Sequence, residues 1–219
     1  ALHLSYSRRI YETVKGRNGH MPGIMRQMKK DFSSVPVRKE KRPLVGVVGE
    51  IFVRSHEFSN EELVRKVEKL GGEVWLAPIE EWIYYVNEMS FRKALIKKDG
   101  SAIMNIFLKK YFQKAIEHKY GKIFRDFLKT LKEPETADIL KKAAPYVHDS
   151  FEGETVLSVG KAIDLIQRGA SGIICAMPFG CMPGTIVTAL MKAVSKDYDV
   201  LCISIPYDGA ESSSTSLQL

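Results

Sequence analysis

The chain has 219 residues, of which 45% are hydrophobic and 27% charged, and its formal net charge is +7 at pH 7. This composition is that of a globular protein with a sizeable core, and it excludes a disordered chain, a collagen and a low-complexity array. No apolar run approaches the roughly 18 residues of a membrane span, and three cysteines are too few for a disulfide framework, which favours a reducing cytoplasm.

The basic residues are concentrated in two stretches. Residues 1–43 hold eleven Lys and Arg against three Asp and Glu, and residues 92–132 hold twelve against three. Such an excess can bind nucleic acid, a membrane surface or an anionic ligand, and it can also be a set of solvated helix faces. The chain has no zinc-finger spacing, aromatic-rich RNA-binding strand or helix-turn-helix pattern. We therefore expect neither nucleic acid nor a membrane as a partner.

The first 42 residues are expected to form a helical segment ahead of the main domain. Helices are predicted over residues 4–15 and 22–32, with the turn-forming residues 16–19 between them. A polar, charge-rich link follows them. The main α/β domain is expected over residues 43–219.

The pattern after residue 43 predicts a βαβ unit. Residues 44–49 are an apolar, β-branched run typical of a strand that is covered on both faces. Ser59 and Glu62 have the spacing of a capping box, which predicts that a helix starts there, and two glycines end that helix. The next strand is predicted over residues 73–77. Such a unit is nearly always right-handed, with its strands parallel.

A long helical stretch then interrupts the alternation. Helical patterns are found over residues 79–97, 101–131 and 135–147, with no alternating stretch of β-branched residues among them. This is far more chain than a crossover between two parallel strands requires. We therefore predict a helical insertion at about residues 79–150.

The alternation of strands and helices resumes after the insertion. Helices are predicted over residues 155–168 and 185–195, and strands over 170–176 and 200–205. Four strands with interleaved helices predict an α/β fold with an open parallel sheet of the flavodoxin-like or doubly wound type. Ligands of such sheets bind outside the carboxyl ends of the strands.

Three chain segments are expected at that carboxyl edge. The first strand ends at Glu50, with Arg54 a few residues on, the third runs into the loop of residues 177–184, and the fourth ends near Asp208. Functional residues are more frequent on such loops than in a core. The edge would thus combine two carboxylates, a guanidinium and a thiol.

Cys181 is the strongest single candidate for chemistry. It lies between Gly180 and Pro183, directly before a predicted helix, and proline suits the first helical position. A helix N-terminus favours a thiolate, which can act as a nucleophile or bind a soft metal, whereas the alternative is a buried and inert thiol. Cys175 and Cys202 lie within apolar strands, and we expect them to be core residues. The five histidines lack the spacing of a metal site.

Several motifs together resemble one known family. They are GVVGEIFVR (46–54), LGGEVWLAP (70–78), LSVGKAID (157–164), MPFGCMPG (177–184) and YDG (207–209). In these motifs the chain is similar to the C-terminal part of the 2-hydroxyacyl-CoA dehydratase-like proteins, in the branch of CoA-substrate-specific enzyme activase-related proteins. The resemblance runs from about residue 5 to 210.

The resemblance implies flavodoxin-like domains with helical additions and an oxygen-sensitive [4Fe–4S] cluster, held by cysteines from separate domains and reduced by an ATP-hydrolysing activator. It puts Cys181 at the position of one metal ligand, and the family's other ligand cysteines have no counterpart in this chain. The residues expected to surround the cluster are Gly180, Pro183, Gly184, Glu50, Arg54 and Asp208.

From this resemblance we expect a fragment of a longer protein that contributes one cysteine to an iron–sulfur site used in ATP-driven electron transfer. No cluster is expected on this chain alone. The expected partners are the rest of the full-length protein or the activator, and a homodimer is left open. The alternative is a non-catalytic α/β interaction domain, which would dock an activator through its basic helices, or a nucleotide- or CoA-binding domain. No GxxxxGK[ST] phosphate loop supports the last of these.

Overall fold

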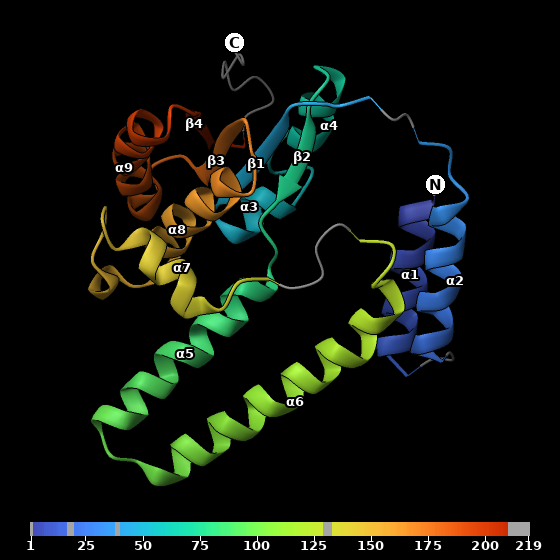
Figure 1. Cartoon of the computed structure of the whole chain (residues 1–219), viewed down its shortest axis with the longest axis horizontal. Helices are drawn as coiled ribbons and strands as arrows, with labels where there is room; N and C mark the ends of the chain where they lie inside the picture. The colour runs from blue at the N-terminus through green and yellow to red at the C-terminus, as the bar shows by residue number, and fades with distance from the viewer. Residues whose placement is uncertain (1, 17–19, 38–39, 129–132, 210–219) are drawn as a thin grey trace. The chain divides into compact units, whose positions relative to one another are not determined.

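The computed structural model describes residues 2–16, 20–37, 40–128 and 133–209 (Figure 1). The chain forms two compact units, each described here by itself. The helical unit consists of residues 1–40 and 86–133, and the sheet unit of residues 41–85 and 134–219. Helix α5 (Glu80–Ile96) begins in the sheet unit and ends in the helical unit.

The sheet unit is built on four parallel strands in the order β2-β1-β3-β4. This confirms the predicted α/β fold with an open parallel sheet. The register sets Gly49, the last residue of β1, opposite Ala176 of β3. The strands are β1 (Leu44–Gly49), β2 (Glu73–Leu76), β3 (Gly172–Pro178) and β4 (Leu201–Tyr207).

Helices cover the two faces of this sheet unequally. Val47 of β1 joins a buried cluster with Val53 and Leu63, so the short helices α3 and α4 lie on its face. Gly46 points the opposite way, because side chains alternate along a strand; a Cβ added there would lie 2.8 Å from Leu165 of α8. Helix α9 packs beside α8 and on β4. These helices are α3 (Ile51–Ser55), α4 (Leu63–Lys69), α8 (Gly153–Gln167) and α9 (Met182–Tyr198).

Helix α8 is the central helix of the sheet unit. Its residues from Thr155 to Leu165 are all buried, because α7 (Thr136–Ala143) and α9 pack against it in addition to the sheet. Gly160 allows α7 to approach: a Cβ at this position would lie 2.3 Å from the carbonyl oxygen of Ile139. The close fit leaves no room for a larger residue.

Helix α8 also carries buried charges. The Lys161 side chain is 1% exposed and lies 3.3 Å from a carboxylate oxygen of Glu81 in the first turn of α5. The buried Asp164 carboxylate lies 2.9 Å from Lys142 of α7 and 3.3 Å from Arg168. Nearby, the Tyr85 hydroxyl accepts a hydrogen bond of 2.6 Å from the Gly153 amide. These contacts fasten the start of α5 to the sheet unit.

The helical unit has a much smaller core. Helix α1 packs against α2, and α2 packs against α6. The Tyr6 hydroxyl of α1 donates a hydrogen bond to the Asp31 carboxylate of α2. The helices are α1 (Leu2–Val14), α2 (Met21–Ser33), α6 (Gly100–Phe124) and the second part of α5.

The expected insertion overlaps the helical unit over residues 86–133, whereas α7 belongs to the sheet unit. Within residues 79–147, the described part contains helices and no strand, as predicted. The expected helix of 101–131 corresponds to α6, which ends earlier, at Phe124; residues 125–128 are not helical, and the last three positions lie outside the described residues. Residues 17–19, which belong to the turn expected between the first two helices, also lie outside the described residues.

The predicted capping box at Ser59 is wrong. Helix α4 begins at Leu63, and Glu62 has a φ of 58° with no side-chain capping bond. The Ser59 hydroxyl is instead hydrogen-bonded to His56 at 2.9 Å. The side-chain oxygen of the buried Asn60 accepts a hydrogen bond of 3.1 Å from the Leu63 amide. Asn60 therefore makes the kind of capping bond that the pattern predicted for Ser59.

Candidate functional site

A small pocket lies at the carboxyl ends of β1 and β3, and we call it the β1/β3 pocket. The chain leaves β1 toward β2 on one side and later returns to β3 on the other, so the strand order reverses here. Open α/β sheets bind their ligands at this position. The pocket is small, with a cavity volume of about 10 Å³, which is about the space that one water molecule needs. Its ionisable and hydroxyl side chains are Glu50, Glu154, Ser158, Cys175 and Cys181.

Two glycines bring the walls of the pocket together. Gly49 has a φ of +113°, and a Cβ there would lie 2.1 Å from the carbonyl oxygen of Ala176. A Cβ at Gly184, in the first turn of α9, would lie 2.5 Å from the sulfur of Met177. The absence of these side chains lets the end of β1 and the start of α9 approach β3.

Cys181 stands at the N-terminus of α9. It is the residue before the first turn, it is partly exposed, and its side chain makes no capping bond to the helix. Its carbonyl oxygen accepts the Thr185 amide at 2.9 Å and the Thr185 hydroxyl at 3.0 Å, which fixes the backbone of the turn. The Cys181 thiol therefore lies at the pocket and takes no part in capping α9.

The other two cysteines have a different environment. Cys175 is fully buried in β3, and burial raises the pKa of its thiol to about 12. Burial also raises the pKa of Cys202 to about 11, and its thiol lies 3.5 Å from the carbonyl oxygen of Val200, to which it donates. Both thiols are therefore protonated at neutral pH.

Two carboxylates flank the pocket. The Glu50 carboxylate caps α3, because it accepts the Phe52 amide at 3.0 Å and the Val53 amide at 2.6 Å. Glu154 lies in the first turn of α8 and accepts the Ile51 amide at 3.4 Å. Burial raises the pKa of Glu154, and the nearby charge of Glu50 acts in the same direction.

Three of the predicted site residues do not line the β1/β3 pocket. Arg54 is 4% exposed and donates to the carbonyl oxygens of Gly49 at 2.9 Å and Pro78 at 3.3 Å. Burial lowers its pKa, although surrounding carboxylates favour its charged form. Gly180 and Asp208 are exposed in the loops after β3 and β4. Glu50, Cys181, Pro183 and Gly184 do line the pocket.

Sequence reasoning missed the contribution of α8. Glu154 and Ser158 reach the pocket from this helix. A helix that precedes a parallel strand starts at the carboxyl edge of the sheet, because it runs opposite to the strands. Glu154 lies directly before the helix predicted over residues 155–168, so its position at this edge of the sheet was a usable signal.

The pocket's side chains fit one ligand of an iron–sulfur cluster and not a complete site. Such clusters are held by about four cysteine thiolates. The pocket is lined by two thiols, and one of them, Cys175, is buried with a raised pKa, which leaves Cys181 as the thiol available to a metal. Among the described residues, no three His, Cys, Asp or Glu side chains are grouped to hold a metal ion. Further ligands would have to come from other chain segments.

Comparison with known proteins gives no family assignment: no family model, curated protein or solved structure matches the chain. In the part of the chain that the structure describes, no helix combines the length and the apolar character needed to cross a membrane. The functional argument therefore depends on the pocket and on the sequence motifs.

Proposed function

We propose that the chain is the part of a 2-hydroxyacyl-CoA dehydratase-like iron–sulfur protein that supplies one cysteine ligand, Cys181, to a cluster. The observation that carries the proposal is the place of this thiol, at the N-terminus of α9 and in the pocket where the strand order reverses. The sequence resemblance supplies the identity of the metal group. A cytoplasmic location, where thiols stay reduced, is part of the proposal.

The environment of Cys181 suits a thiolate ligand. Helix N-termini stabilise negative charge through their exposed amides and the helix dipole, and α9 has 17 residues. Gly184 keeps the first turn of this helix against Met177, so the thiol is held in place by packing. When bound, an iron–sulfur cluster would supply one-electron transfer; this chain would orient one of its irons and exclude water on the side of β3.

The charge of the pocket argues against a phosphate-bearing ligand at the same place. The charged side chains that line it are the carboxylates Glu50 and Glu154, and these repel a nucleotide or CoA phosphate. Arg54, the nearest candidate counter-charge, is buried and donates to backbone carbonyls. The pocket is also smaller than the roughly 300–1,000 Å³ typical of small-molecule sites. The pocket therefore gives no support to nucleotide or CoA binding.

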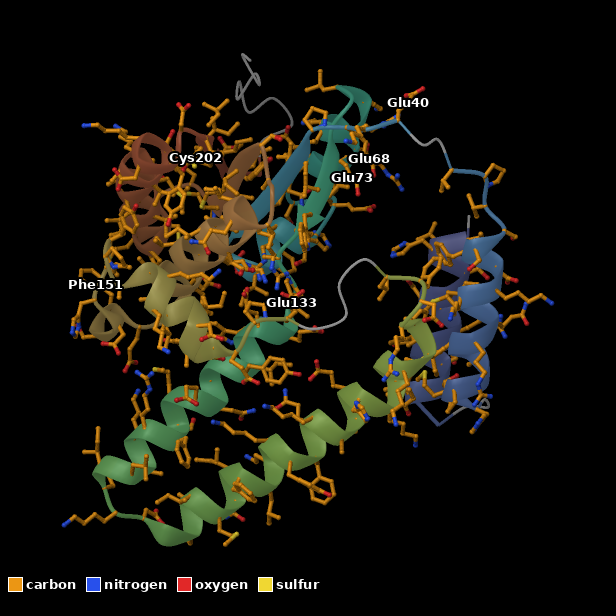
Figure 2. The ribbon with its side chains drawn as sticks, in the orientation of Figure 1. Glu40, Glu68, Glu73, Glu133, Phe151 and Cys202 are labelled. Carbon is orange, nitrogen blue, oxygen red and sulfur yellow. The ribbon has the colours of Figure 1, made fainter. Side chains whose placement is uncertain are left out.

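The test is cluster reconstitution under anaerobic conditions in the natural protein that contains this sequence. We expect Cys181→Ala to abolish or convert the electron paramagnetic resonance signal of the cluster, because one thiolate is removed. Cys202→Ala is the matched control, since this thiol is half-buried in β4 (Figure 2) and outside the pocket. An unchanged spectrum in the Cys181 variant would remove this residue from the ligand set.

A further inference from the structure

Two of the three cysteines line the same small cavity. The β1/β3 pocket is formed by residues of the sheet unit alone, and both Cys175 and Cys181 belong to its wall. Its cavity of about 10 Å³ has room for about one water molecule. The two thiols therefore face one space that can hold a single oxygen atom.

The packing of α9 on β3 places both thiols at this cavity. Cys175 and Met177 lie on the same face of β3, because side chains alternate along a strand, and both line the pocket. The first turn of α9 lies against that face, since a Cβ at Gly184 would be 2.5 Å from the Met177 sulfur. Cys181 is the N-cap residue of the same helix. The helix thus brings its N-terminal thiol to the face of β3 that carries the buried thiol.

The two thiols differ in the form that their surroundings favour. Burial is the main cause of the raised pKa of the Cys175 thiol, and a negative charge on Cys181 raises this pKa further, more than one on Cys202 does. Cys181 is partly exposed at a helix N-terminus, a position that favours thiolates. An oxidant therefore reacts first with Cys181, while Cys175 stays protonated beside it.

The register of the sheet excludes the other two pairs of cysteines. Cys202 of β4 is opposite Ile173, whereas Cys175 is opposite Ser204. Cys175 and Cys202 are thus offset by one strand and two residues, a Cα separation of about 8 Å, and a disulfide requires less than about 7 Å. Cys181 lies beyond the carboxyl end of β3, far from Cys202 at the amino end of β4. Cys175 and Cys181 are the pair that remains.

We propose that Cys175 and Cys181 form a reversible disulfide when the protein meets a hydroperoxide. The Cys181 thiolate attacks one oxygen of the hydroperoxide, the O–O bond breaks, and Cys181 becomes a sulfenic acid while the other oxygen leaves as water or an alcohol. The Cys175 sulfur then attacks the Cys181 sulfur, the S–O bond breaks, and the leaving hydroxide takes the Cys175 proton to become water. The hydroperoxide gains two electrons, and the two thiols lose two.

The pocket suits both steps. Its cavity has room for the oxygen of a sulfenic acid on Cys181, next to Cys175. The turn before Cys181 has space to shift, because a Cβ at Gly180 would meet no atom within 4 Å. The disulfide would prevent Cys181 from binding a metal or acting as a nucleophile until a dithiol reduces it. The inference does not rest on the iron–sulfur proposal, because the pair forms without a metal.

The first test maps the disulfide in the natural protein that contains this sequence, prepared without metal. The protein is treated with hydrogen peroxide, its free thiols are blocked, and it is digested with chymotrypsin, which cleaves after Phe179, between the two cysteines. We expect two peptides, one with each cysteine, joined by a bond that dithiothreitol breaks. Methionine oxidation does not imitate this result, because dithiothreitol does not separate peptides that carry it.

Two outcomes of this map would overturn the proposal. One is an oxidised Cys181 without a link to Cys175. The other is a link from Cys181 to a second copy of the chain or to a different cysteine, because the pocket would then not have paired the two thiols.

Substitution of each cysteine assigns the two roles. We expect Cys175→Ala and Cys181→Ala each to abolish the cross-link. Cys202→Ala is the matched control and should leave its yield unchanged, because Cys202 (Figure 2) lies outside the pocket. Circular dichroism checks that each variant is folded, and the map of the wild-type protein decides the proposal even if Cys175→Ala does not fold.

A sulfenic-acid probe tests the order of the steps. In Cys175→Ala the sulfenic acid on Cys181 has no thiol to react with, so dimedone should label Cys181 at least about fivefold more than in the wild type. Equal labelling in the two proteins would show that Cys175 does not react with the sulfenic acid, and it would overturn the proposal.

Discussion

The sheet unit and the helical unit are stabilised in different ways. Among the described residues, the helical unit has four buried hydrophobic side chains, Tyr6, Ile24, Ala94 and Ile106, and all other buried hydrophobic residues belong to the sheet unit. The sheet unit even buries a lysine and its carboxylate partners. We infer that the fold of the sheet unit depends on close packing, whereas the helical unit, with its small core, is more tolerant of substitution.

The largest expected effect comes from the buried charges of the sheet unit. Lys161→Met removes the buried ammonium that lies 3.3 Å from Glu81 and 3.7 Å from Asp164, whereas Asp164 keeps its contacts with Lys142 and Arg168. Removing one member of a buried ion pair destabilises a protein by about 3–5 kcal/mol. Chemical denaturation should show a loss of this size. The double variant Lys161→Met/Glu81→Gln should recover part of it, because the buried negative charge of Glu81 is then removed as well, and equal losses in both would contradict the pairing.

A pair of Gly→Ala substitutions compares the packing of the two units directly. At Gly160 of α8 the new Cβ would lie 2.3 Å from a backbone oxygen of α7, and we expect a loss of about 1–3 kcal/mol from overpacking. At Gly121 of α6 no atom lies within 4 Å, and alanine should stabilise the helix by about 0.5–1 kcal/mol. Denaturant midpoints measure both changes. The same sign at the two positions would contradict the proposed difference between the units.

The sequence predicted the strands of the sheet unit better than the start of α4 or the burial of its polar side chains. The apolar runs around Val47 and Ile174 are long and β-branched, so they specify strands without help from distant residues. The start of α4 was mispredicted, because Ser59 fits the capping pattern and Asn60, which caps the helix, is recognisable only from its buried contacts. Lys161 shows the same limit: a lysine in a helix is expected at the surface, and α7, α5 and the sheet bury it.

The residues at the β1/β3 pocket also differ in how far the local sequence predicted their positions. The loop after β3 identified Cys181 from local features, its place before a proline-started helix. Arg54 follows β1 closely in sequence, but it turns into the protein to bind two carbonyl groups. Glu154 is about a hundred residues from Glu50, and only the packing of α8 on β1 brings the two carboxylates to one pocket.

The Glu154 carboxylate at the pocket has a smaller effect on the free energy of unfolding, and this effect depends on pH. The pKa of Glu154 is raised in the folded protein, so the native state binds a proton more strongly than the unfolded state does. Stability therefore falls as pH rises through the interval between the unfolded and the folded pKa of this group. We expect Glu154→Gln to remove this loss, with a gain of less than about 1 kcal/mol at pH 7 because the group is partly solvated. Below the unfolded pKa the variant and the wild type should be equally stable; a gain that persists in acid would exclude this cause.

The smallest expected effect on folding is at Cys181, although this residue carries the proposed function. Its side chain is partly exposed and does not cap α9, so Cys181→Ala should change the free energy of unfolding by no more than about 1 kcal/mol. Native-state alkylation at pH 8 should label Cys181 and spare Cys175, whose thiol is fully buried and has a pKa of about 12. Denaturation should then expose Cys175 to the reagent. A large loss of stability in Cys181→Ala would instead make this thiol a structural residue. Labelling of Cys175 before Cys181 would show that the pocket opens from the side of β3, and it would remove the physical basis for assigning reactivity to Cys181.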